Sequence, residues 1–78
     1  MIMIKEHESV VLAVDLPSAG LVAGDVGVVV HIYESGKAYE VEFITLDGNT
    51  VAVETLEAEK IRPIRAREIP HVREIAAA

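Results

Sequence analysis

Three histidines are the first residues to test for chemistry, because imidazole is the commonest metal ligand and a frequent general base. His7, His31 and His71 have none of the i, i+2 or i, i+4 spacings that bring two imidazoles to one face of a strand or helix. The chain has no cysteine to complete a thiolate site. We therefore expect neither a metal site nor a cofactor.

Gly20, Gly24 and Gly27 give the spacing G-x-x-x-G-x-x-G, which superficially resembles a phosphate-binding loop. A loop of that kind is followed by a helix N-terminus and usually carries a Lys with Ser or Thr. Here Asp25 follows Gly24 and would repel phosphate, and a valine-rich strand comes next. We interpret these glycines as turn and strand-bend residues.

Paired carboxylates are the remaining candidates for acid–base chemistry. Glu40 and Glu42 alternate with apolar residues in one predicted strand, and Asp15 and Asp25 bracket the first long loop. Acid–base catalysis needs a carboxyl whose pKa is raised by burial, whereas outward residues of a hairpin are solvated. Because the sequence has no cysteine and no evident His-plus-acid set beside its few serines, we predict that the protein is not an enzyme.

Short strands must position these residues, because apolar runs separated by turn residues recur about every ten positions. The predicted strands cover residues 9–14, 26–33, 39–44, 50–54 and 61–64, with a single helical turn at 56–60. Asp47-Gly48-Asn49 predicts a hairpin turn between the third and fourth strands. Five short strands, a long first loop and a one-turn helix predict an all-β, SH3-like barrel over residues 1–64. An OB-like barrel is disfavoured because no longer helix fits between the strands.

The alternation of side chains predicts which residues face the core. Tyr39, Val41 and Phe43 share one side of the third strand, with acidic residues on the other. The second strand is apolar on both faces, so its second face must be covered by the curled barrel or by a partner chain. Gly27 would permit the bend of such a barrel.

Residues 65–78 form a tail with two interpretations. Ile69, Val72 and Ile75 recur at three-residue spacing, and Pro70 can occupy the first turn of a short helix that runs to the terminal alanines. The other interpretation is a disordered tail.

Composition and charge limit the function classes. The 78 residues hold 13 Asp and Glu against 7 Lys and Arg, a formal charge of −6. Residues 1–60 carry 11 acids and 3 lysines, net −8, whereas residues 61–78 carry 4 arginines and 2 glutamates, net +2. The acidic body argues against a basic nucleic-acid footprint. No apolar run approaches the roughly 18 residues of a membrane span, and the start of the chain is too short and acidic for a signal peptide. We expect a cytoplasmic protein without a membrane partner.

The motif L-x-x-G-D-x-G-x-V-V at residues 21–30 is similar to the KOW-type element of ribosomal and transcription proteins. In those families the element is a barrel strand opened by a glycine, and flanking Lys and Arg neutralise phosphates. Here acidic residues stand in the flanking positions, and Lys37 is the nearby cation. The resemblance therefore supports the fold, whereas the acidic flanking residues disfavour nucleic-acid binding.

The same motif, together with Y-E-V-E-F at residues 39–43 and D-G at 47–48, resembles a family of small bacterial proteins described only as a domain of unknown function. The resemblance covers most of the chain up to residue 64. It implies a cytosolic, stand-alone barrel that is often encoded beside toxin-like or nuclease-like genes. An antitoxin-like or immunity-like role follows as an expectation, and no catalytic residues come with it.

The leading hypothesis is a protein–protein interaction module whose acidic body meets a basic partner. The candidate contact residues are Tyr33, Tyr39, Glu40 and Glu42, with Val11, Val29 and Ile44 as outward apolar anchors. The alternative is nucleic-acid binding through the arginines in and beside the tail, Arg62, Arg65, Arg67 and Arg73. A third hypothesis is self-association, because a small barrel leaves apolar surface uncovered. For the acidic residues, a merely solvated surface is an equally good interpretation.

Overall fold

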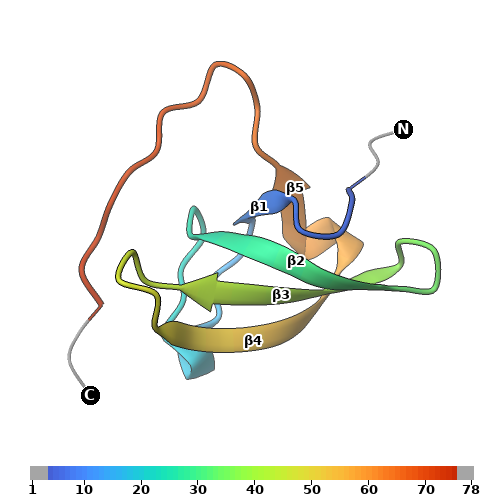
Figure 1. Cartoon of the computed structure of the whole chain (residues 1–78), viewed down its shortest axis with the longest axis horizontal. Coiled ribbons are helices and arrows are strands. Elements are labelled where there is room, and N and C mark those ends of the chain that lie inside the picture. Colours follow the sequence, from blue (N-terminus) through green and yellow to red (C-terminus); the bar gives the residue numbers. More distant parts are fainter. Residues whose placement is uncertain (1–3, 76–78) are drawn as a thin grey trace.

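The computed structural model describes residues 4–75, in which the regular structure consists of strands and short 3-10 turns (Figure 1). The strands are β1 (Ser9–Leu12), β2 (Val26–Tyr33), β3 (Ala38–Ile44), β4 (Thr50–Glu57) and β5 (Ile61–Pro63). Two 3-10 turns, η1 (Pro17–Ala19) and η2 (Ala58–Lys60), precede β2 and β5. The predicted all-β class, with one helical turn before the last strand, is confirmed.

The five strands form one antiparallel sheet in the order β4-β3-β2-β1-β5. β2 is eight residues long, so its first part pairs with β1 while its remainder pairs with β3. β5 returns to the other edge of β1, which makes the first and last strands neighbours. This is the strand order of an SH3-like barrel, as the sequence predicts.

The D-G turn lies between β3 and β4, where the sequence predicts it. Gly48 adopts φ +91°, a conformation that glycine reaches without a steric cost. The N–H of Thr45 donates to the Asn49 carbonyl at 2.9 Å, and the N–H of Gly48 donates to the Thr45 carbonyl at 2.9 Å. The turn, together with a register shift between Phe43 and Ile44, places Glu42 directly opposite Val53.

β2 bends through two local features. Its register with β3 shifts between Val29 and His31, which leaves Val30 as the extra residue of a β-bulge and increases the local twist. Gly27 faces the inside of the curl, where an added Cβ would lie 2.6 Å from Val41 Cγ1. Gly27 is therefore a position at which β2 curls closely onto β3 and no side chain fits between them.

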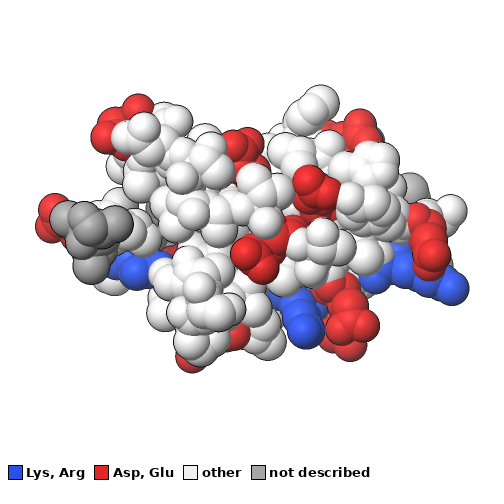
Figure 2. Space-filling view, turned by 90° about the horizontal axis from the view of Figure 1, so that it is seen from below, with Lys and Arg blue, Asp and Glu red and all other residues white. Residues whose placement is uncertain are grey.

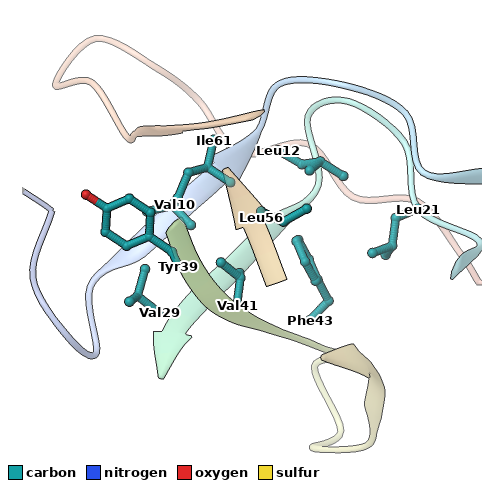
Figure 3. Close-up of a cluster of buried hydrophobic side chains, with 9 residues drawn as sticks. All are labelled: Val10, Leu12, Leu21, Val29, Tyr39, Val41, Phe43, Leu56 and Ile61. Carbon is teal, nitrogen blue, oxygen red and sulfur yellow. The ribbon is translucent and has the colours of Figure 1, made fainter. Parts of the chain in front are cut away.

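Nine side chains form the core, and Figure 3 shows them gathered inside the curled sheet: Val10, Leu12, Leu21, Val29, Tyr39, Val41, Phe43, Leu56 and Ile61. The period of two predicted for β3 is confirmed, because Tyr39, Val41 and Phe43 are all buried. Leu21 reaches the core from the loop before β2, so the loop is part of the packed structure.

Some strand ends differ from the predictions. β1 and β5 end earlier than expected, at Leu12 and Pro63. β4 continues to Glu57, and the helical turn follows it instead of beginning at residue 56. The reason is that Leu56 pairs with Tyr39 and is 3% exposed, so it belongs to the core side of β4.

The tail after β5 contains no helix within the described part of the chain, so the predicted short helix is wrong there. A turn at 66–67 is followed by irregular backbone that runs along the outside of the barrel (Figure 1). Ile69 and Val72 are 88% and 76% exposed. An apolar stripe without packing cannot support so short a helix in water. The alanines at 76–78, where the predicted helix would end, lie outside the described residues.

Candidate interaction sites

The outward side of β3 carries two glutamates, each held by a hydroxyl from a neighbouring strand. Tyr33 Oη donates a hydrogen bond to Glu40 Oε1, and Thr50 Oγ1 donates to Glu42 Oε2 at 2.7 Å. The bond to Glu40 raises the pKa of Tyr33 above its ordinary value, because ionisation removes the proton that the phenol donates to the carboxylate. Both hydroxyls orient a carboxylate without neutralising its charge.

Exposed apolar side chains flank these glutamates. Val53, opposite Glu42, is 48% exposed, and Ile44, two residues further along β3, is 47% exposed. We name the following set the acidic sheet face: Tyr33, Glu40, Glu42, Ile44 and Val53. Among residues 4–75, no Lys or Arg forms an ion pair with either glutamate of this face. In the view of Figure 2, acidic side chains lie across the middle of the molecule as well as at its ends.

Two predicted contact residues lie in the core instead. Val29 is fully buried and Tyr39 is 6% exposed. Val29 shares the inner side of β2 with Gly27, because residues two apart in a strand point the same way. The prediction that Val29 is an outward anchor is therefore wrong, and Tyr39 cannot present its ring to a partner.

Val11 lies between the core residues Val10 and Leu12, so it faces the outer side of β1, yet it is only 8% exposed. It lines an open-sided cavity of about 260 Å³ between the barrel and the tail, to which the tail contributes Ile69 and Pro70. The prediction that Val11 is an exposed anchor is therefore wrong, because Val11 is buried. Of the three predicted anchors, Ile44 is the one that lies open to solvent.

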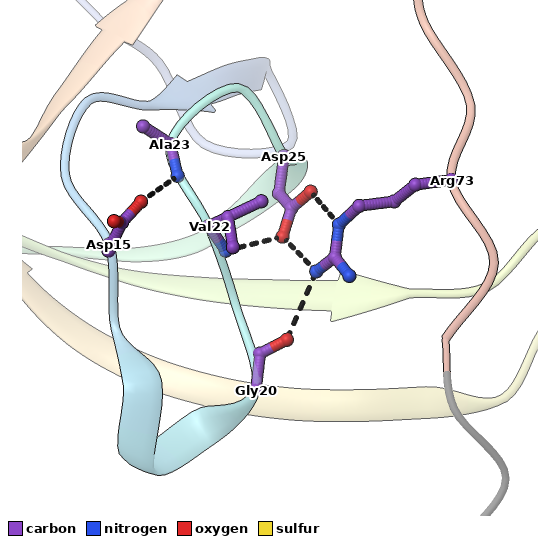
Figure 4. A network of polar contacts seen from close by, with 6 residues as sticks. All are labelled: Asp15, Gly20, Val22, Ala23, Asp25 and Arg73. Carbon is purple, nitrogen blue, oxygen red and sulfur yellow. Dashed lines mark hydrogen bonds and ion pairs between the residues drawn. The ribbon is translucent and has the colours of Figure 1, made fainter.

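The loop between β1 and β2 is held by two carboxylates that accept hydrogen bonds from its own backbone (Figure 4). Asp15 Oδ1 accepts the N–H of Ala23 at 2.9 Å, and Asp25 Oδ2 accepts the N–H of Val22 at 2.9 Å. Short polar side chains stabilise loops in this way because they satisfy backbone donors that no strand partner reaches. The loop therefore presents the Asp25 carboxylate in a fixed orientation.

Arg73 of the tail binds this fixed carboxylate. Its Nε donates to Asp25 Oδ1 at 2.8 Å, and its Nη2 donates to Asp25 Oδ2 at 2.6 Å and to the Gly20 carbonyl at 3.0 Å. The Asp25 side chain is 16% exposed and that of Arg73 is 34% exposed. The hydrogen bonds from Arg73 lower the pKa of Asp25 below its usual value. The contact joins segments 48 residues apart in the sequence.

The other arginines do not join Arg73 in one patch. Arg62 Nη1 and Nη2 donate to the two carboxylate oxygens of Glu68 at 2.9 and 2.5 Å, and the backbone N–H of Arg65 donates to Glu68 Oε1 at 2.7 Å. These donors lower the pKa of Glu68 to about 2. Arg65 and Arg67 are exposed. Two of the four predicted nucleic-acid contacts, Arg62 and Arg73, are thus paired with carboxylates of the same chain.

In the part of the chain that the structure covers, neither a metal site nor a membrane-spanning helix is found. Within residues 4–75, no three His, Asp or Glu side chains gather closely enough to hold a metal ion. The same residues include no helix of the length and hydropathy that crossing a membrane requires. The sites with an ordered geometry are the acidic sheet face and the pair of acceptors, the Asp25 carboxylate and the Gly20 carbonyl, that Arg73 contacts.

Comparison with protein-family models matches residues 6–63 to the family described as "Domain of unknown function (DUF4926)". The chain belongs to this family. The DUF4926 match runs from the segment before β1 to the end of β5, so it contains the acidic sheet face and Asp25 but not Arg73. No curated protein and no solved structure matched the chain.

The sequence indicates Asp25 as a carboxylate that brackets the first loop and Arg73 as a nucleic-acid contact in the tail, but it does not pair the two residues. One signal in the sequence points to the pairing: residues 1–60 carry net −8 and residues 61–78 net +2, so the C-terminal segment is attracted back onto the body. The sequence does not indicate Thr50, which donates to Glu42, or Val53 of the acidic sheet face, because the position of both depends on the register of β4.

Proposed function

We propose that this DUF4926 protein is a non-catalytic protein-binding module whose acidic sheet face meets a basic protein. The observation that carries the proposal is the arrangement of Glu40 and Glu42, which hydroxyl groups orient and which no cation of residues 4–75 neutralises. Carboxylates ordered before binding lose less side-chain entropy when a partner's Lys or Arg arrives. The acidic sheet face is therefore preorganised to bind cationic side chains.

The apolar members of the face supply contact area beside the charges. Ile44 and Val53 are each about half exposed and flank Glu42 on neighbouring strands. A specific interface of ordinary size covers roughly 800 Å² per partner, and the chain exposes 5795 Å² in total. One side of so small a barrel is therefore large enough to form a complete interface.

The partner that fits this surface is a small basic protein, for example one with a nucleic-acid-binding cleft lined by Lys and Arg. Opposite charges raise the rate of encounter and disfavour acidic competitors. A bacterial antitoxin or immunity protein that covers the cleft of a nuclease-like toxin is the most specific form of the proposal. That form draws on the gene neighbourhood implied by the family resemblance, and it assigns the protein to the cytoplasm.

Nucleic-acid binding through the tail has weaker support. Arg62 and Arg73 are already engaged by Glu68 and Asp25, and the barrel beside them is acidic. A phosphate chain would have to displace these carboxylates and approach a net charge of −8 on residues 1–60.

Co-expression with the product of the adjacent gene tests the proposal. The wild-type chain is expected to co-purify with that product and to relieve any growth inhibition that it causes. The double variant Glu40→Gln/Glu42→Gln should bind more weakly, because each exposed ion pair contributes about 0.2–1 kcal/mol, up to about fivefold in affinity.

The matched control is Glu34→Gln/Glu59→Gln, which removes the same charge at two exposed positions that are not members of the acidic sheet face. It should retain most of the affinity. Equal weakening by the two double variants would show that only net charge matters, and it would contradict the assignment of the face. An adjacent product that forms no complex with the wild-type chain would rule out the antitoxin-like form.

A further inference from the structure

The contact between Arg73 and Asp25 has the geometry of a receptor site for a guanidinium. Both carboxylate oxygens of Asp25 accept from different nitrogens of Arg73, and the Gly20 carbonyl accepts from Nη2. The receptor half is built independently of the tail, because Val22 N–H fixes Asp25 and Asp15 fixes the neighbouring turn of the loop (Figure 4). Two-pronged contacts of this kind select the planar fork of arginine over the point charge of lysine.

The tail is held in this site by side chains and not by strand pairing. The backbone hydrogen bond found beyond β5 in residues 64–75 lies within the tail itself, from Glu68 N–H to the Arg65 carbonyl at 3.2 Å. The apolar side chains Ile69 and Val72 are 88% and 76% exposed, so they bury little surface against the barrel. Releasing the tail from the Asp25 end therefore breaks few contacts other than those of Arg73.

The receptor and its present occupant also belong to different parts of the chain. The loop with Asp25 lies inside the family match at residues 6–63, whereas Arg73 lies in the tail beyond it. When the tail leaves, it uncovers Val11, which lines the cavity of about 260 Å³ under Ile69 and Pro70 together with Val26, a side chain that is already 47% exposed. In a partner segment, an apolar side chain next to the bound arginine could pack against these valines.

We propose that Asp25 and the Gly20 carbonyl form a binding site for an arginine side chain in an extended, basic segment of a partner protein, and that Arg73 occupies this site until the partner displaces it. The inference rests on the proposed function, because a basic protein partner supplies the arginine. It adds a second, chemically specific contact to the acidic sheet face and makes the tail an internal competitor.

The test uses a synthetic peptide with the sequence of residues 69–75 as a guanidinium probe, and the full-length Arg73→Ala chain as the receptor. Binding is followed by NMR shifts of the backbone amides of Gly20, Val22 and Asp25. The peptide should bind the Arg73→Ala chain more tightly than the wild-type chain, whose own tail competes. A peptide with Lys in place of its arginine should bind about tenfold more weakly, and Asp25→Asn in the Arg73→Ala background should abolish the shifts.

Several results would overturn the inference. Equal affinity for the Arg and Lys peptides would reduce the site to non-specific charge attraction, and equal affinity of the Arg73→Ala and wild-type chains would show that the tail does not compete. A wild-type mass near twice 8.4 kDa that falls to 8.4 kDa in Arg73→Ala would assign the site to the tail of a second copy. Because Asn keeps the acceptor for Val22 N–H, unchanged loop amide shifts in Asp25→Asn without peptide confirm that the loop still folds.

The two proposals fail separately. If Asp25→Asn leaves binding of the adjacent gene product unchanged while Glu40→Gln/Glu42→Gln weakens it, the arginine site is wrong and the acidic sheet face stands. If Asp25→Asn weakens that binding and the peptide prefers the Arg73→Ala chain while Glu40→Gln/Glu42→Gln changes nothing, the arginine site stands and the acidic sheet face is wrong.

Discussion

Gly27→Ala is the substitution whose cost follows most directly from the structure. An added Cβ would lie 2.6 Å from Val41 Cγ1, 2.9 Å from Phe43 Cε1 and 3.0 Å from the Glu42 carbonyl oxygen. Val41 is fully buried and Phe43 is 2% exposed, so neither side chain has free space to retreat into. Overpacking of this kind costs about 1–3 kcal/mol. For 78 residues the total free energy of unfolding is roughly 4–12 kcal/mol, so the loss is a large fraction of the stability.

Urea unfolding of Gly27→Ala, Val41→Ala and the double variant measures this effect. Val41→Ala alone removes two methyl groups, each worth about 0.8 kcal/mol before any cavity term. It also removes the atom closest to the new Cβ. We therefore expect the double variant to lose less stability than the sum of the two single losses, with a coupling of about 0.5–3 kcal/mol.

Gly48→Ala is the matched control, because an added Cβ there meets no atom within 4 Å. It is destabilising for a different reason, the φ of +91°, and Val41→Ala should give it no relief. Additive losses for the pair Gly27 and Val41, or a Gly27→Ala loss below about 0.5 kcal/mol, would refute the close approach of β2 and β3.

Three further predictions concern ionisation and packing. In Arg62→Gln the pKa of Glu68, measured by carboxyl ¹³C NMR, should rise from about 2 toward 4.5. The wild-type pair therefore stabilises the docked tail fully above pH 4.5, and this contribution is lost as the pH falls toward 2. An unchanged titration midpoint of Glu68 would contradict the pairing. Glu40→Gln should lower the pKa of Tyr33 toward 10.0, seen by phenolate absorbance against a Tyr33→Phe blank. The wild-type hydrogen bond thus stabilises the protein below pH 10.0, and this contribution is lost as the pH rises through the raised pKa of Tyr33. Identical Tyr33 titrations in the wild type and Glu40→Gln would contradict the bond. Val29→Ala should lower the free energy of unfolding, measured with urea, by about 2–3 kcal/mol. A loss as small as that of a surface substitution would contradict the burial of Val29.

The predictable part of the fold is the part that local patterns determine. The alternation of acidic and apolar residues in β3 marks its inner side unambiguously, and Asp47-Gly48 marks the hairpin turn that follows. Once these are placed, five short strands with a long first loop leave few chain paths, and the SH3-like order is confirmed. The outward position of Glu40 and Glu42 follows from the same alternation.

The parts that the sequence does not determine depend on contacts between distant residues. Val29 was assigned to the wrong side because β2 is apolar on both faces, so no polar residue marks the outside, and the bulge at Val30 interrupts the alternation. The end of β4 depends on the pairing of Leu56 with Tyr39. The path of the tail depends on Arg73 meeting a carboxylate 48 residues away, which the charge asymmetry suggests but cannot locate.

The central claim is that the acidic sheet face recognises a basic protein, and association kinetics with the adjacent gene product test it most directly. Rate constants are measured at ionic strengths where the Debye length is about 30 and 8 Å. The account predicts that association of the wild-type chain slows as salt rises, and that Glu40→Gln/Glu42→Gln slows it at low salt more than Glu34→Gln/Glu59→Gln does. Equal rates for the two double variants at both ionic strengths would contradict the claim.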